Sequence, residues 1–139
     1  MRELPRQLSA EELADLFSGR TRFAERVARR ERPLEVAGEV ARALSEEEKA
    51  EALAAHPRIG EASPEQRGDE PRVLAELAEL NRAYEEKFGF RFVVFVDRRP
   101  RSAIVPILRD RLERTREEEL ETGLQELVAI ARDRWMRTT

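Results

Sequence analysis

Paired hydroxyl and carboxylate residues mark several helix starts in this chain of 139 residues. In each pair, a serine or threonine stands three residues before a glutamate and directly ahead of helically spaced apolar residues. The pairs are Ser9 and Glu12, Ser45 and Glu48, and Thr115 and Glu118. This pattern is the capping box, whose two side chains satisfy backbone N–H groups that a helix start leaves without partners. Because the boxes recur along the whole chain, they predict a succession of helices.

Other start and stop signals fall between the boxes. Pro33 and Pro71 stand where a proline begins a helix well, and Gly89 follows a long apolar stripe as a glycine that ends one. Counting all signals gives about seven to eight helices. The sequence therefore predicts an all-α fold, a helical bundle in a single domain over residues 1–139.

Residues 90–96, with the sequence FRFVVFV, are the one segment with the composition of a strand. A single strand has nothing to pair with in a helical domain, so we predict a buried extended connector rather than a sheet. Its backbone amides then need other partners. A polar ligand could supply them.

Composition excludes several classes of function. The net charge of −3 provides no global basic field, so we expect no nucleic-acid partner. No segment has the ~20 apolar residues that cross a bilayer, so we expect a cytoplasmic protein and no membrane partner. The chain has no cysteine and one histidine, which excludes thiolate chemistry and a multi-histidine metal site within one chain. We expect no metal.

The single histidine, His56, follows a predicted helix in the run AHPRIG. Pro57 disfavours helical geometry at His56, and Gly60 frees the backbone soon after. Such a histidine is often only a hydrogen-bonded surface residue. However, loops at helix ends commonly display functional side chains, and proton chemistry near neutral pH depends on this imidazole.

Glu65 stands nine residues after His56, in the run Ser63-Pro64-Glu65-Gln66. These residues are typical of an ordinary helix start. A helix start also favours a bound anion, and a carboxylate can orient an imidazole for acid–base catalysis. Both interpretations are compatible.

Four runs occur in order along the chain: AHPRIG, SPEQ, LNRAYEEKFGFRFVV and REEELETGLQELVAIARDRW. Together with LSAEELADLF near the N-terminus, they closely resemble the 2-oxo-4-hydroxy-4-carboxy-5-ureidoimidazoline (OHCU) decarboxylase family of urate degradation. The resemblance covers nearly the whole chain. It implies an all-helical homodimer that needs no cofactor and converts a small molecule, the ureidoimidazoline, stereospecifically to (S)-allantoin.

The resemblance also implies roles for particular residues. His56 matches the catalytic acid or base, and Glu65 its catalytic partner. Arg134 matches an arginine near the C-terminus that anchors the substrate, with Arg132 as the alternative. The remaining matches are to substrate-binding positions: Pro57, Gln66, Phe92, Val93, Val94, Phe95 and Val96.

The chain departs from the family pattern in one important place. Only Pro64 separates Ser63 from Glu65, and the loop from His56 to Glu65 is shorter than usual. Two other functions therefore stay open: a different small-molecule enzyme on the same scaffold, or a non-catalytic helical interaction module.

Overall fold

The computed structural model describes residues 3–59 and 71–137, which form helices and connecting segments without a strand. The helices in these ranges are α1 (Ala10–Leu16), α2 (Arg22–Ala28), α3 (Pro33–Arg42), α4 (Glu46–Ala54), α5 (Pro71–Phe88), α6 (Arg101–Leu112) and α7 (Arg116–Arg137). The all-α prediction is confirmed. The further helix start expected at residues 63–66 lies outside the described residues.

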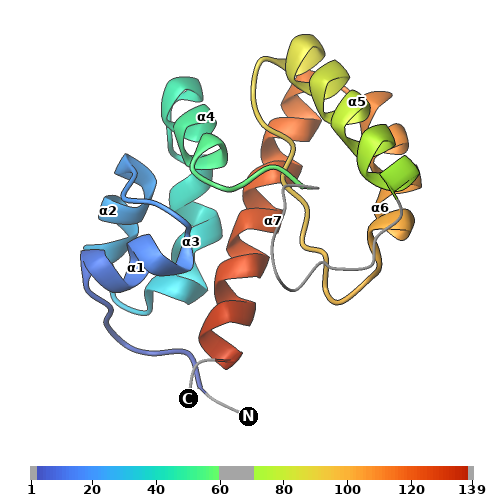
Figure 1. Ribbon diagram of the computed structural model, residues 1–139. Helices are drawn as coiled ribbons and strands as arrows, with labels where there is room; N and C mark the ends of the chain where they lie inside the picture. Colours follow the sequence, from blue (N-terminus) through green and yellow to red (C-terminus); the bar gives the residue numbers. More distant parts are fainter. Residues whose placement is uncertain (1–2, 60–70, 138–139) are drawn as a thin grey trace.

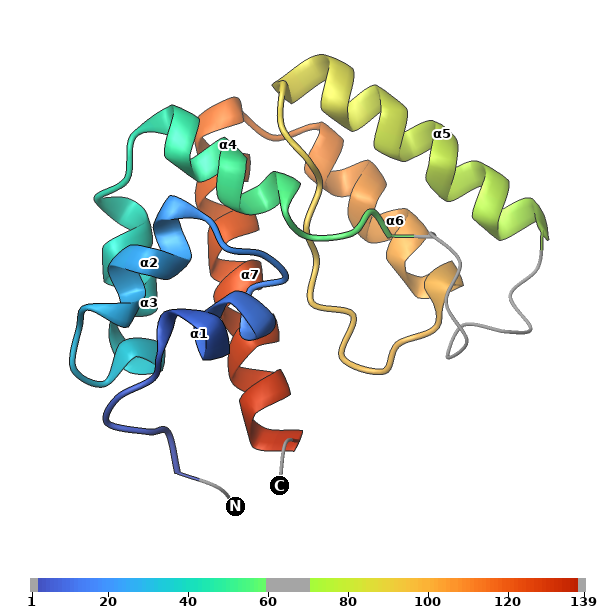
Figure 2. The same ribbon diagram turned by 60° about the vertical axis from the view of Figure 1, so that its left-hand side comes forward.

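Helix α7 lies between two groups of helices (Figures 1 and 2). Helices α1, α3 and α4 pack against it on one side, and α2 packs on α1, α3 and α4. On the other side, α5 and α6 pack against each other. The buried apolar residues form one continuous cluster that runs through both groups.

The three predicted capping boxes are present. The backbone N–H of Ser9 donates to Glu12, that of Ser45 to Glu48 and that of Thr115 to Glu118. In return, each hydroxyl accepts from the backbone N–H of its glutamate, at 3.1 to 3.2 Å. Local side-chain chemistry therefore fixes where α1, α4 and α7 begin.

The segment between α5 and α6 is the predicted extended connector. Gly89, with φ of 81°, ends α5, and residues 90–96 then run extended beside α7 (Figure 2). Phe92 and Val93 are fully buried, and the Val93 carbonyl accepts a hydrogen bond of 2.7 Å from the guanidinium of Arg111. A side chain thus satisfies this backbone group in place of a neighbouring strand.

Helix α1 ends at Leu16, and Ser18, two residues later, has left-handed backbone with φ of 67°. This conformation affects the site, because Ser18 lies against His56. Helix α6 begins at Arg101, so Pro106 lies in its second turn.

Candidate active site

A pocket of about 570 Å³ opens where three parts of the fold meet. The segment after α4 contributes His56, the connector contributes Val94, Phe95 and Val96, and α7 contributes Arg134. The other lining residues are Asp97, Arg98, Arg99, Pro100, Arg101, Ile130, Asp133 and Arg137. The fold thus brings together residues predicted from three separate sequence motifs.

His56 stands just beyond the C-terminal end of α4, where its backbone N–H donates to the Leu53 carbonyl at 3.2 Å. Its Nδ1 lies 3.3 Å from the Ser18 hydroxyl oxygen. That oxygen also accepts a hydrogen bond of 2.6 Å from the Arg134 guanidinium. Ser18 therefore connects the imidazole to the arginine across the wall of the pocket.

The surroundings of His56 favour its neutral form. Burial lowers the pKa of the imidazole to about 4, and the positive charges of Arg134 and Arg91 act in the same direction. At neutral pH the side chain therefore has a nitrogen lone pair available, and it can accept a proton from a bound molecule.

Arg134 and Arg132 lie in different environments. Arg134 lines the pocket, and its guanidinium also donates to the Leu16 carbonyl at 2.9 Å. Burial lowers its pKa from the ordinary arginine value. Arg132 instead donates to the carbonyls of Leu34 and Glu35 in α3 and is not among the pocket residues. Of the two arginines considered from the sequence, Arg134 is the one that lines this pocket.

The connector residues fall into two groups. Val94, Phe95 and Val96 line the pocket, whereas Phe92 and Val93 are buried in the core and are not lining residues. The backbone N–H of Phe95 donates to Glu126 at 3.3 Å. Within the described part of the chain, this leaves the amides of Val94 and Val96 as the better candidates for contacts with a ligand.

The remaining predicted residues are not at the pocket wall. Pro57 is exposed beside His56 and does not line the cavity. Glu65 and Gln66 lie outside the described residues, as does Ser63, so their roles stay predictions. Ser18 and Arg91, which both contact the histidine segment, were not predicted from the sequence. Arg91 stands within the run FRFVVFV, but nothing in that run marks it as a partner of His56, and Ser18 stands in none of the quoted runs.

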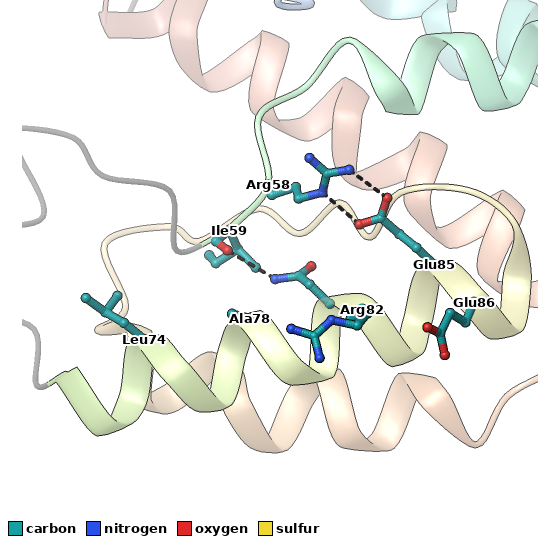
Figure 3. A pocket seen from close by; sticks show the side chains of 8 residues that line it. Arg58, Ile59, Leu74, Ala78, Arg82, Glu85 and Glu86 are labelled. Carbon is teal, nitrogen blue, oxygen red and sulfur yellow. Dashed lines mark hydrogen bonds and ion pairs between the residues drawn. The ribbon is translucent and has the colours of Figure 1, made fainter.

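A second pocket, of about 500 Å³, lies on the α5 side of the histidine segment (Figure 3). Arg58 forms a bidentate ion pair with Glu85 there, with N–O distances of 2.8 and 3.0 Å. The amide nitrogen of Asn81 donates to the Ile59 carbonyl at 3.1 Å. These contacts hold the residues that follow His56. The imidazole lines the first pocket, which is therefore the better candidate for proton chemistry.

The described residues contain no cluster of histidine, cysteine and acidic side chains suited to a metal ion. Among the described helices, none has the length and apolar character that would let it cross a membrane.

The all-α fold places one neutral imidazole, one half-buried arginine and an extended backbone segment around a single pocket, which are groups that a helical acid–base enzyme would use. Residues 2–136 match the profile of the OHCU decarboxylase family. The chain belongs to this family, and its activity is that of a carboxy-lyase, an OHCU decarboxylase.

Two solved structures share the fold. A crystal structure of OHCU decarboxylase in the presence of (S)-allantoin superposes with a TM-score of 0.76 at 26% identity, over 88% of this chain and 94% of the other. A crystal structure of (S)-allantoin synthase superposes with a TM-score of 0.71 at 23% identity, over 91% of this chain but 48% of that longer chain. No curated protein sequence matches the chain.

Proposed function

We propose that the pocket beside His56 is where this enzyme decarboxylates the ureidoimidazoline, stereospecifically and without a cofactor, to (S)-allantoin. The observation that carries the proposal is the meeting of His56, Val94 to Val96 and Arg134 around one cavity. The structure similar to this chain at 26% identity was obtained in the presence of (S)-allantoin, which is consistent with the product proposed here.

The substrate can supply its own electron sink. When the bond to the carboxylate breaks, the electron pair moves toward the ring C=N group and CO₂ leaves. The ring nitrogen that receives the electrons takes up one proton from solvent. The hydroxyl proton is then lost as a carbonyl group forms, and a proton is added to the ring carbon that carries the ureido group. The protein needs to contribute orientation and control of these protons.

We assign the proton transfers to His56. The pKa of about 4 makes it a neutral base in the resting enzyme, able to take the hydroxyl proton and return a proton to one face of the ring carbon. Addition from one face fixes the hand of the product. Glu65 is proposed to orient the imidazole, and Gln66 and the connector amides to bind the carbonyl and ureido groups.

We assign the substrate anion to Arg134. Its guanidinium lies in the pocket wall and is linked through Ser18 to His56. A planar guanidinium suits a carboxylate, because it can donate two parallel hydrogen bonds. This arrangement would hold the reacting carbon beside the imidazole.

The test uses freshly generated substrate and circular dichroism to follow allantoin of one hand. We expect the wild-type protein to accelerate its formation, and His56→Asn to lower kcat by about 100-fold or more. Full stereospecific turnover by His56→Asn would contradict the assignment. Failure of the wild-type protein to exceed spontaneous decay would favour a different reaction on this scaffold.

The homodimer, the single domain and the cytoplasmic location are further proposals, supported by the family resemblance and by the sequence composition. Sedimentation equilibrium of the purified full chain tests the first: a mass of one chain, 16.1 kDa, would contradict the dimer.

A further inference from the structure

The side chain of Arg91 is hydrogen-bonded to the backbone at His56. One terminal nitrogen of its guanidinium, Nη1, donates to the carbonyl oxygens of Ala54 and His56, at 2.7 Å in each case. Ala54 is the last residue of α4, and the carbonyl groups at a helix end lack partners within the helix. Arg91 therefore satisfies one of these groups together with the carbonyl of the histidine itself.

Arg91 also stands at the start of the connector, whose next residues lead into the pocket wall. Arg91 directly precedes Phe92 and Val93, which are both 1% exposed and fixed in the core. The pocket wall of Val94, Phe95 and Val96 follows at once. Through Arg91, the backbone of His56 is thus tied to the start of the wall that it faces.

The other contacts of the histidine segment come from different elements. The ion pair of Arg58 with Glu85 and the bond from Asn81 to Ile59 tie the following residues to α5 (Figure 3). Ser18 contacts the imidazole from the end of α1. Among the contacts of the described residues, the bond from Arg91 connects the histidine backbone to the connector.

We propose that Arg91 is a positioning residue, which sets the distance and angle between His56 and the connector wall by bonding the carbonyls of Ala54 and His56. The proposal rests on the proposed function of His56. Rates of enzymes with pre-positioned groups are sensitive to displacements of about 1 Å, so loss of this contact affects the chemical step more than substrate binding.

The test compares Arg91→Met with Arg91→Lys. Methionine keeps an apolar stem but removes the charge and both donors, whereas lysine keeps a charged donor. We expect Arg91→Met to lower kcat by about tenfold and to change KM by less than about twofold. Arg91→Lys should recover most of the loss. Added guanidinium chloride at low concentration should partly restore Arg91→Met, while sodium chloride at the same ionic strength should not.

Arg132→Met is the matched control. Arg132 is also half-buried and also donates to two backbone carbonyls, but it lies away from the pocket. An equal loss of kcat in Arg91→Met and Arg132→Met, at equal melting temperatures, would overturn the proposal. If Arg91→Met does not fold, Arg91→Gln takes its place under the same criteria.

A second readout does not depend on turnover. His56 is the only histidine, so its imidazole NMR signals can be read without interference. We expect them to shift or broaden in Arg91→Met and to stay at their wild-type positions in Arg132→Met. Unchanged signals in both variants would overturn the positioning role. If the wild-type protein shows no turnover, the proposed function fails, and the NMR comparison alone decides the role of Arg91.

Discussion

Ser18 combines an unfavourable backbone with a central position in the site. Its φ of 67° lies in the left-handed region, which costs a non-glycine residue about 1–2 kcal/mol. Its hydroxyl nevertheless joins the imidazole of His56 to the guanidinium of Arg134. Strained residues of this kind persist where the surroundings hold them, often at functional sites.

Two substitutions separate the backbone of Ser18 from its hydroxyl. Ser18→Gly and Ser18→Ala both remove the hydrogen bonds, but only glycine relieves the strain. We expect similar losses of kcat/KM in both, and a free energy of unfolding higher in Ser18→Gly than in Ser18→Ala by about 1 kcal/mol. Urea denaturation and steady-state turnover measure the two effects. Wild-type activity in either variant would show that the hydroxyl is dispensable.

The lowered pKa of His56 predicts how stability depends on pH. Between about pH 4 and 6.5, His56 is protonated in the unfolded chain but stays neutral in the folded protein. The contribution of His56 to the free energy of unfolding is therefore present above pH 6.5 and declines as the pH falls toward 4. We expect the melting temperature of the wild-type protein to fall more steeply over this range than that of His56→Asn. Parallel curves would contradict the lowered pKa.

The same shift has a consequence for activity. Because the resting imidazole is neutral, kcat/KM should show no titration near pH 6.5, the ordinary value for histidine. The charges that set this behaviour come from Arg134 on α7 and from Arg91 at the start of the connector.

At the scale of the elements, the starts of helices were predictable from the sequence. The way in which separate segments come together around one pocket was not. A capping box depends on residues three positions apart, so α1, α4 and α7 could be placed from Ser9, Ser45 and Thr115 alone. The end of α5 was predictable in the same way, because Gly89 follows Phe88 with φ of 81°. Local signals therefore place the helix boundaries at which a capping residue stands.

The connector shows what composition can and cannot predict. The absence of a strand partner correctly predicted an extended buried segment at residues 90–96. It could not separate Phe92 and Val93, which pack in the core, from Val94 to Val96, which line the pocket. That division depends on the path of the connector past α7 and Arg111, which no local pattern records. Arg91 was missed for the same reason, because its partners lie 35 and 37 residues away.

At the scale of the whole molecule, a buried cluster of charged side chains joins α5, α6, α7 and the connector. The Glu119 carboxylate, on α7, accepts hydrogen bonds from the Tyr84 hydroxyl on α5 and from Nε of Arg111 on α6, each at 2.7 Å. Arg111 also stacks 4.4 Å from the centre of the Phe92 ring and donates to the Val93 carbonyl. Glu119 also pairs with Arg114, at 2.9 Å. Three helices and the connector therefore meet at one cluster of charged side chains.

Removing one partner of the Arg111–Glu119 ion pair should lower the stability of the folded protein. The side chains of Arg111 and Glu119 are 7% and 0% exposed, so Glu119→Gln leaves a buried guanidinium without its counter-charge. We expect the free energy of unfolding to fall by roughly 3–5 kcal/mol, measured by urea denaturation.

The double substitution Arg111→Met with Glu119→Gln separates the ion pair from simple packing. Because it removes both charges, it should be less destabilising than the sum of the two single substitutions. Strictly additive losses would mean that the two side chains do not stabilise each other. Since Arg111 also holds the Val93 carbonyl, the double variant should fold but lose turnover, with shifted His56 imidazole signals. Unchanged signals would show that the pocket wall keeps its place without the buried cluster.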